Sequence, residues 1–458
     1  MPRLRASAAF QAGGRWHSAR LDLIALLTIA WPVVISRLGI MGMGLCDALV
    51  VGRYSATQLG FHALAWAPVS VVVTMVVGLS SGVQVLTARA MGQGNPAAAG
   101  AILRRGVVYS LWVGLGATLV LWVAGPGLLH VLGLKADLAA GASKPLLVFA
   151  LSMPGYGLSI AASFWLEGLA RPKPAAALMW VANGVNLLVD LVLVPGTFGL
   201  PALGAVGGAW ATTVARTFLG VALMVYIANM ADARELGVFD KPPHDRAAEA
   251  EQRRIGFGAG ASNFFEVAAF AGMNIIAGWI GGLAVAAWAI TLNVVAIIFM
   301  VPLGISSAAA VLVGRAYGAR DPAGVDRAGW MAFSVTAAFG LIMAVLIWPL
   351  APILAQGFTQ DPATLALATP ALALCGLFLI PDAVQVVCAQ TLRARGDVWA
   401  PTFTHLASYA VLMAPLGWWL AIPLKMGING IVWAVIWASL LSAGLLLFRF
   451  RYLSLRGR

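Results

Sequence analysis

Apolar stretches long enough to cross a lipid bilayer recur along almost the whole of this 458-residue chain. A helix needs about 20 apolar residues to cross a hydrocarbon layer about 30 Å thick. Strands of a membrane barrel would alternate apolar and polar residues, and these stretches do not alternate. Because 61% of the residues are apolar and only 10% are charged, a soluble domain could not bury so much apolar surface. The sequence therefore predicts an all-α polytopic membrane protein.

We predict twelve transmembrane helices. Their approximate bounds are 23–50, 60–88, 106–131, 145–169, 175–197, 203–229, 256–281, 284–314, 329–355, 364–392, 399–422 and 428–448.

The basic residues are distributed unevenly along the chain, which has a formal net charge of +12. Most Lys and Arg lie in the termini or in connectors that follow even-numbered helices. The exceptions are Arg53, Lys135, Lys144 and Lys425 in the other connectors, and Arg37 and Arg216 inside predicted helices. This asymmetry is typical of a membrane protein with both termini in the cytoplasm, so we expect a multi-pass protein of the inner membrane. This distribution argues against nucleic-acid binding as the reason for the positive net charge.

The chain contains an internal repeat. Residues 78–98, "GLSSGVQVLTARAMGQGNPAA", and 304–324, "GISSAAAVLVGRAYGARDPAG", match at an offset of 226, and "GAVGGAWA" at 204 matches "GINGIVWA" at 427. Since each half has an even number of helices, both halves enter the membrane in the same orientation. We therefore expect two six-helix lobes related by a pseudo-two-fold axis along the membrane normal, a plan used by secondary transporters. The predicted parts are a basic cytoplasmic arm (1–20), an N-terminal lobe (21–230), a cytoplasmic linker (231–254), a C-terminal lobe (255–450) and a cytoplasmic tail (451–458).

Four acidic residues lie inside predicted helices: Asp47, Asp190, Glu266 and Asp382. A carboxylate near the bilayer centre costs on the order of 2.5–3.5 kcal/mol on insertion scales, so each must face water, find a partner or hold a proton. One alternative is structural, in which these acids pair with the intramembrane arginines. The other is a binding site.

The first-lobe residues form one candidate site. Asn186 and Asp190 are one helical turn apart and share a face. With Asp47 and Thr212 they offer oxygen ligands for Na⁺, or close carboxylates that share a proton. The alternative for Thr212 is a hydrogen bond to its own helix backbone.

The second-lobe residues form another candidate site. Glu266 follows Asn263 by one turn, Gln385 follows Asp382 by one turn, and Asn293 adds a polar point to the eighth helix. Carboxylates flanked by aromatic residues and methionine suit large, flat organic cations.

Other sequence patterns indicate little chemistry. The histidines His62, His130 and His405 have no partner at metal-ligand spacing, so we expect no metal site apart from Na⁺ and no cofactor. No phosphate loop with its lysine occurs, and no nucleophile and base lie at helical spacing, so we expect no enzyme. We expect Glu167 to form an interfacial ion pair with Arg171.

At these residues the chain resembles the multidrug and toxic compound extrusion (MATE) family. The resemblance covers nearly all twelve helices and is most specific at "CDALVVGR", at "GLSSGVQVLTARAMGQGN", at "GISSAAAVLVGRAYGA" and at "PDAVQVVCAQTLRARGD", the last similar to the NorM-type branch. It implies a two-lobed exporter that expels cationic, amphipathic drugs in exchange for H⁺ or Na⁺.

The family pattern also implies roles for individual residues. Its acids fall on Asp47, Glu266 and Asp382, and an Asn-x-x-x-Asp more familiar in the DinF-type branch falls on Asn186 and Asp190. The threonine of the sixth helix falls on Thr212, with Thr213 as the competing choice. The chain thus carries the polar clusters of both branches.

The resulting prediction is a secondary antiporter working by alternating access. Its partners are small organic cations and the lipid bilayer, without nucleic acid, and we expect a monomer. A flippase for lipid-linked saccharides is the alternative, and it would need a cavity rich in basic residues, for which this sequence offers only Arg37 and Arg216.

Overall fold

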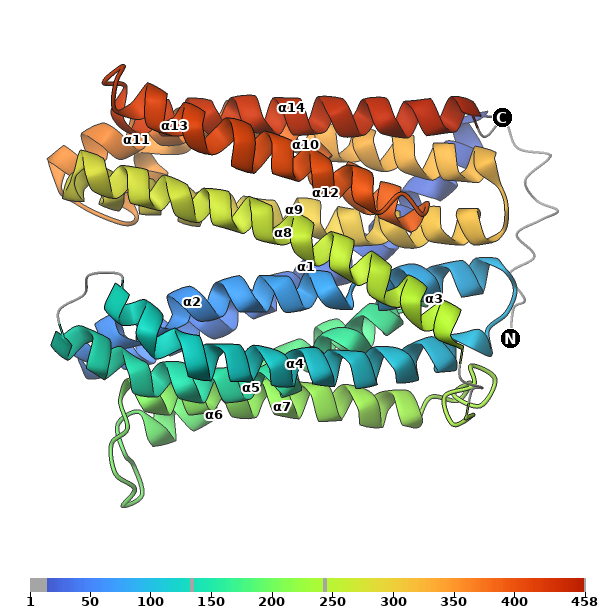
Figure 1. Cartoon of the computed structure of the whole chain (residues 1–458), viewed down its shortest axis with the longest axis horizontal. Helices are drawn as coiled ribbons and strands as arrows, with labels where there is room; N and C mark the ends of the chain where they lie inside the picture. The colour runs from blue at the N-terminus through green and yellow to red at the C-terminus, as the bar shows by residue number, and fades with distance from the viewer. Residues whose placement is uncertain (1–14, 132–135, 242–244, 457–458) are drawn as a thin grey trace.

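The computed structural model describes residues 15–131, 136–241 and 245–456, and within these ranges every regular element is a helix (Figure 1). Most of the predicted basic arm lies outside the described residues, as does Lys135, and the side chain of His130 is not described either. The helices form two layers, one largely from each half of the chain, with the first part of α1 and the first turns of α8 reaching the other layer (Figure 1). The start of α1 and the end of α14 lie at the same end of the molecule, which we call the end with the termini.

The first lobe contains seven helical segments that make six spans. They are α1 (Arg15–Tyr54), α2 (Ala56–Ser80), α3 (Gly82–Gly92), α4 (Ala98–Val131), α5 (Ala136–Gly168), α6 (Lys173–Leu193) and α7 (Ala205–Ala228). α2 and α3 follow one another across Ser81 and together make one apolar span.

The second lobe repeats this order. It contains α8 (Arg246–Ile280), α9 (Gly282–Gly318), α10 (Pro322–Gln356), α11 (Pro362–Ala394), α12 (Trp399–His405), the π-helical segment η2 (Leu406–Met413), α13 (Ala414–Ala421) and α14 (Gly427–Arg456). Eleven helices of the described residues are long and apolar enough to cross a membrane. The remaining predicted span, 399–422, is divided among α12, η2 and α13, so the twelve-helix, two-lobe fold is confirmed. α8 begins inside residues 231–254, and α14 continues into residues 451–458.

Side-chain caps explain where several helices begin. Asp245, Asp321 and Asp361 each accept hydrogen bonds from backbone N–H groups at the start of α8, α10 and α11. These bonds satisfy donors that have no partner within the helix, and proline at the first turn of α10 and α11 needs none.

Glycines let α3 and α9 cross closely at the end of the molecule that carries the termini. A Cβ atom at Gly92 would overlap the carbonyl oxygen of Arg315, and one at Gly318 would overlap the carbonyl oxygen of Arg89. Both pairs of equivalent residues differ by the repeat offset of 226. The crossing therefore lies on the pseudo-two-fold axis.

Two arginines fasten the lobes together at the same end, again as a symmetric pair. Arg89 on α3 donates to the carbonyl oxygens of Arg393 (3.1 Å) and Ala394 (3.0 Å) at the end of α11. Arg315 on α9 donates to the carbonyl oxygen of Leu169 (2.8 Å) just beyond α5. The last carbonyl groups of a helix have no partner within it and carry partial negative charge, so a cation binds them well. We call these contacts the arginine clasps.

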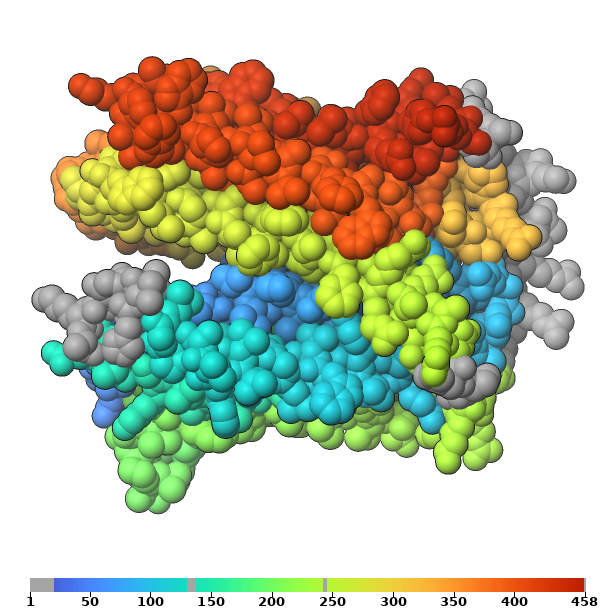
Figure 2. All heavy atoms as spheres, viewed as in Figure 1, coloured from blue at the N-terminus to red at the C-terminus, as the bar shows by residue number. Residues whose placement is uncertain are grey.

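The other end of the molecule is open between the lobes. Figure 2 shows a hollow between α8 of the second lobe and α2 of the first, which closes towards the end with the termini. The structure is therefore closed at the terminus side and open at the opposite side.

The expectation for Glu167 was wrong. Its side chain is buried, lies 3.6 Å from the guanidinium of Arg37, and accepts hydrogen bonds from Gln84 (2.6 Å) and Ser307 (2.5 Å). Arg171 instead pairs with Asp232 at 2.6 Å, and this hydrogen bond holds the pKa of Asp232 below its usual value. Nearness in the sequence suggested Arg171, but the partners of Glu167 come from distant segments, including Ser307 on α9 of the other lobe.

Candidate ion and substrate sites

The first-lobe cluster is formed by three helices. Asp47 on α1 accepts a hydrogen bond from Asn186 Nδ2 on α6 at 2.8 Å and another from the hydroxyl of Thr212 on α7. The side chains are sealed in the lobe, with exposed fractions of 2% for Asp47, 0% for Asn186 and 2% for Thr212. Only a small ion could occupy such a site without unpacking the helices.

Asp190 completes this cluster and is also fully buried. No N–H or O–H group of the described residues donates to either of its carboxyl oxygens. The carboxyl group of Asp47 lies close enough to interact with Asp190 electrostatically. Two ionised carboxylates so close to one another repel, and a proton or a cation bound between them would relieve that repulsion.

The same cluster offers oxygen ligands for a cation. Asn186 Oδ1 and both oxygens of Asp190 are buried acceptors without a donor within the described ranges. Hard oxygen atoms of this kind are what Na⁺ prefers, so the residues present fit either a proton or a sodium ion. A site built from three or more His, Cys, Asp or Glu side chains does not occur among the described residues, so the sodium alternative rests on two carboxylates together with amide and hydroxyl oxygens.

Thr212 and Thr213 point to different partners. Thr213 donates to the backbone carbonyl oxygens of Ala209 (2.8 Å) and Val148 (3.1 Å), whereas Thr212 donates to Asp47. Thr212 is therefore the threonine that contacts the acidic pair.

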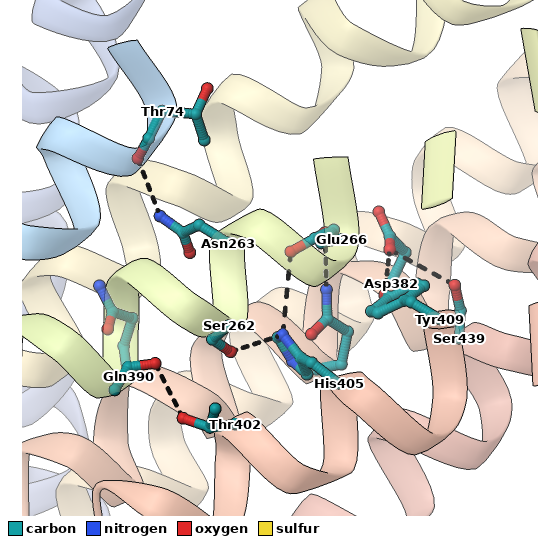
Figure 3. A network of polar contacts seen from close by, with 12 residues as sticks. Thr74, Ser262, Asn263, Glu266, Asp382, Gln390, Thr402, His405, Tyr409 and Ser439 are labelled. Atoms are coloured by element: carbon teal, nitrogen blue, oxygen red, sulfur yellow. Dashed lines mark hydrogen bonds and ion pairs between the residues drawn. The ribbon is translucent and has the colours of Figure 1, made fainter. Parts of the chain in front are cut away.

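The second-lobe cluster joins four helical segments (Figure 3). Gln385 on α11 donates to Glu266 on α8 at 3.4 Å and also interacts with Asp382. Tyr409 on η2 and Ser439 on α14 each donate to Asp382 at 3.4 Å. The glutamine thus links the two acids, and the tyrosine and serine both bind one oxygen of Asp382.

His405, at the end of α12, connects Glu266 to the same network. Its Nδ1 atom lies 2.8 Å from the hydroxyl of Ser262 and 4.0 Å from Glu266 Oε2 (Figure 3). Its Nε2 atom is buried without a partner among the described residues.

Two other predicted residues lie apart from this pair of acids. Asn263 donates to the carbonyl oxygen of Thr74 on α2 at 3.4 Å, so it bridges the two lobes (Figure 3). Asn293 is exposed and donates to the carbonyl oxygen of Ala289 in its own helix at 2.8 Å. The structure gives Asn293 no hydrogen bond to either acid.

His405, Tyr409 and Ser439 were not assigned to the site from the sequence. They come from the interrupted eleventh span and from α14, and π-helical turns of this kind occur often at functional sites. The available signal in the sequence was His405, a histidine inside an apolar run. It was not assigned to the site because it has no partner at metal-ligand spacing in the sequence.

Among the described residues, neither intramembrane arginine forms a hydrogen bond or a close ion pair with these four acids. Arg37 pairs with Glu167, and Arg216 donates to Ser152 at 2.9 Å and lies over aromatic rings. The structural alternative would need an arginine in direct contact with the acids, and no such contact occurs within the described residues. Longer-range attraction remains, of Arg216 for Asp47 and of Arg393 for Glu266.

Two six-helix lobes, closed at one end, open at the other and carrying a buried acidic cluster in each half, define a polytopic membrane transporter. The sequence model of the MatE family matches residues 32–192 and 259–419, one segment in each lobe. The chain belongs to this family.

Relatives and solved structures agree with this assignment. The chain is 63% identical over 437 residues to "Probable multidrug resistance protein NorM" of Caulobacter vibrioides, covering 95% of this chain and 93% of that one. It is 30% identical over 395 residues to the protein of the same name from Aromatoleum aromaticum, covering 86% and 85%. The fold is similar to the crystal structure of the eukaryotic MATE transporter AtDTX14, with a TM-score of 0.87, 19% identity and coverage of 96% and 99%. It is also similar to a MATE family transporter described in its outward-facing conformation, with a TM-score of 0.86, 18% identity and coverage of 95% and 96%.

Proposed function

We propose that this protein is a secondary antiporter that exports organic cations, including drugs, in exchange for H⁺ or Na⁺. The observation that carries the proposal is the pair of buried acidic clusters, one in each lobe, of which one is sealed and the other reachable. The relatives named as multidrug resistance proteins support the choice of drugs as substrates.

The first-lobe cluster is the proposed site of the coupling ion. Asp47, Asn186, Asp190 and Thr212 are sealed among helices, so a proton or a bare sodium ion fits and an organic molecule does not. Neutralising the acidic pair removes the repulsion between two close carboxylates, which changes the packing of α1 against α6 and α7.

The second-lobe cluster is the proposed contact for the cationic substrate. The side chain of Glu266 is 18% exposed, whereas the residue Asp382 is only 5% exposed. Glu266 is thus the acid that a larger ligand could reach, with Gln385 and Asp382 behind it. Phe264 and Phe265 precede Glu266 in α8 with their rings in edge-to-face contact, and we propose that they offer cation–π contact to the substrate.

Exchange follows from competition between the two ligands. An ion that binds one arrangement of the two lobes more tightly than the other shifts the equilibrium towards that arrangement. A ligand that binds both arrangements equally well shifts nothing. We propose that ion uptake at the open side favours the state in which the cation is released.

A lipid-linked saccharide flippase is the less favoured alternative. Pyrophosphate would need free basic side chains within the membrane-spanning part beside the acidic clusters, and the two arginines there, Arg37 and Arg216, are engaged with Glu167 and Ser152.

The test is uptake of a fluorescent organic cation into everted membrane vesicles that contain the full chain. A pH gradient and a Na⁺ gradient are applied separately to the wild type, Asp190→Asn and Glu266→Gln. We expect one gradient to drive uptake, Asp190→Asn to abolish the dependence on that gradient, and Glu266→Gln to raise the cation concentration needed for half-maximal uptake. Losing a charge-assisted contact of about 1.5–3 kcal/mol corresponds to about a tenfold to hundredfold change.

Arg451→Gln is a suitable control, because Arg451 is exposed at the end of α14 and lies outside both clusters. Coupled uptake that is unchanged in both acid variants would show that the sites are wrong. If neither gradient moves any cation, antiport itself is wrong.

A further inference from the structure

A small cavity lined by arginines lies where α8 crosses from the second lobe onto α4 of the first. It has a volume of about 280 Å³, and its charged lining residues are Arg104, Arg105, Glu249 and Arg253. Figure 1 shows the first turns of α8 lying against the other lobe near the termini, and Gln252 on α8 donates to the carbonyl oxygen of Ile102 on α4 at 3.5 Å. The cavity therefore lies between the lobes and is positively charged, since three arginines outnumber one glutamate.

Two donors in this cavity have no partner among the described residues. The Nε atom of Arg105 and the hydroxyl of Tyr109 are buried, and neither makes a hydrogen bond. A buried donor without an acceptor costs about 1–3 kcal/mol, so natural structures rarely leave one unless a ligand or water supplies the acceptor. Arg253 lies near enough to the phenol of Tyr109 to interact with it electrostatically. These two donor atoms therefore remain available to an added acceptor, although the carboxylate of Glu249 also lines the cavity.

The mouth of the cavity continues into an apolar, outward-facing surface. Val108 (52% exposed) and Trp112 (69% exposed) line it, and Leu115 (50%) and Leu119 (62%) follow on the same side of α4. In a membrane protein these side chains face acyl chains, and Trp commonly lies at the level of the headgroups. A ligand that fits both parts has an anionic head and an apolar tail.

We propose that this cavity binds the phosphate of an anionic phospholipid, with the acyl chains lying along α4. Basic pockets between transmembrane helices bind such headgroups by charge and by hydrogen bonds to phosphate oxygens. Arg105 and Tyr109 come from the first lobe and Arg253 from the second. A bound phosphate therefore links the lobes at the closed end and stabilises the arrangement seen here.

The test is lipid binding to the purified full chain, measured by native mass spectrometry during titration. The probes are phosphatidylglycerol and phosphatidylcholine with identical acyl chains. We expect one phosphatidylglycerol to bind more tightly than phosphatidylcholine. We expect Arg105→Gln combined with Arg253→Gln to weaken phosphatidylglycerol binding by about 25-fold, since each arginine near a membrane surface contributes about fivefold.

Arg254→Gln is the control for Arg253→Gln, because Arg254 follows Arg253 in α8 but does not line the cavity. It removes one positive charge next to the cavity without changing the cavity itself. We expect it to retain the wild-type affinity. Tyr109→Phe removes only one hydroxyl and should weaken phosphatidylglycerol binding by a few fold, which keeps the test decisive if the double variant does not fold.

Three results would overturn the proposal. The first is wild-type affinity for phosphatidylglycerol in both the double variant and Tyr109→Phe. The second is equal binding of the two lipids, which would exclude a charge-selective site. The third is displacement of phosphatidylglycerol by millimolar inorganic phosphate, which would identify a free anion as the ligand.

Discussion

At the scale of single residues, neighbours in sequence have different tasks. Thr212 and Thr213 are both buried and both lie in α7, yet one donates to Asp47 and the other to backbone carbonyl groups. Adjacent positions on a helix differ by about 100° in direction, so they meet different partners. Sequence spacing predicted that Asn186 and Asp190 share a face, but it could not choose between the threonines.

This difference makes a matched pair of substitutions. Thr212→Val removes a hydrogen-bond donor to a buried carboxylate, and we expect it to weaken binding of the coupling ion by about tenfold or more. Thr213→Val loses only a bond to backbone groups, and we expect coupling to stay within about twofold of wild type. The measurement is the ion concentration that gives half-maximal uptake of the fluorescent cation. Equal effects of the two substitutions would contradict the assignment of Thr212.

At the scale of elements, the two copies of the internal repeat contact each other. Gly92 packs against the carbonyl oxygen of Arg315, and its counterpart Gly318 packs against the carbonyl oxygen of Arg89. The crossing of α3 and α9 has no room for a side chain at Gly92 or Gly318. The repeated sequence predicted two similar lobes. It did not predict that the repeated segment is itself the place where they meet, because the sequence does not say which face of each lobe is turned towards the other.

We expect Gly92→Ala and Gly318→Ala each to lower the free energy of unfolding by about 1–3 kcal/mol, the usual cost of overpacking. Thermal unfolding of the purified protein in detergent measures this. Gly116→Ala in α4 is the control, because nothing lies within 4 Å of the added methyl group. Alanine is the better helix former, so this control should unfold at the same temperature or higher. An equal loss in all three variants would mean that the crossing is not tightly packed.

At the scale of the whole molecule, the arginine clasps hold one end closed while the other stands open (Figure 2). Arg89 and Arg315 each bind the end of a helix in the opposite lobe. The alternating access that we propose would require these contacts to break when the molecule opens on the terminus side. Under the proposed mechanism, the strength of these contacts would set the balance between the two states.

We expect Arg89→Gln combined with Arg315→Gln to raise the population of the opposite state by about tenfold or more, since hydrogen bonds to charged groups contribute about 1.5–3 kcal/mol each. The measurement is the distance distribution between spin labels at Phe198 and Gln360, which lie in connectors at the open end of the two lobes. A larger fraction of short distances is the expected result. Arg451→Gln should leave the distribution unchanged, and an unchanged distribution in the double variant would show that the clasps do not control opening.

The sequence by itself determined the membrane class, the twelve spans and the division into two lobes. These follow from the length of the apolar stretches and from the similarity of the two halves of the sequence. Both are properties of the chain that do not depend on how the helices pack. Only the tertiary structure decided how the polar side chains pair: Glu167 with groups from α1, α3 and α9, Thr212 with Asp47, and Asp382 with residues from η2 and α14. The physical reason is that such pairs depend on how each helix is rotated against its neighbours. That rotation is set by contacts between segments far apart in the chain.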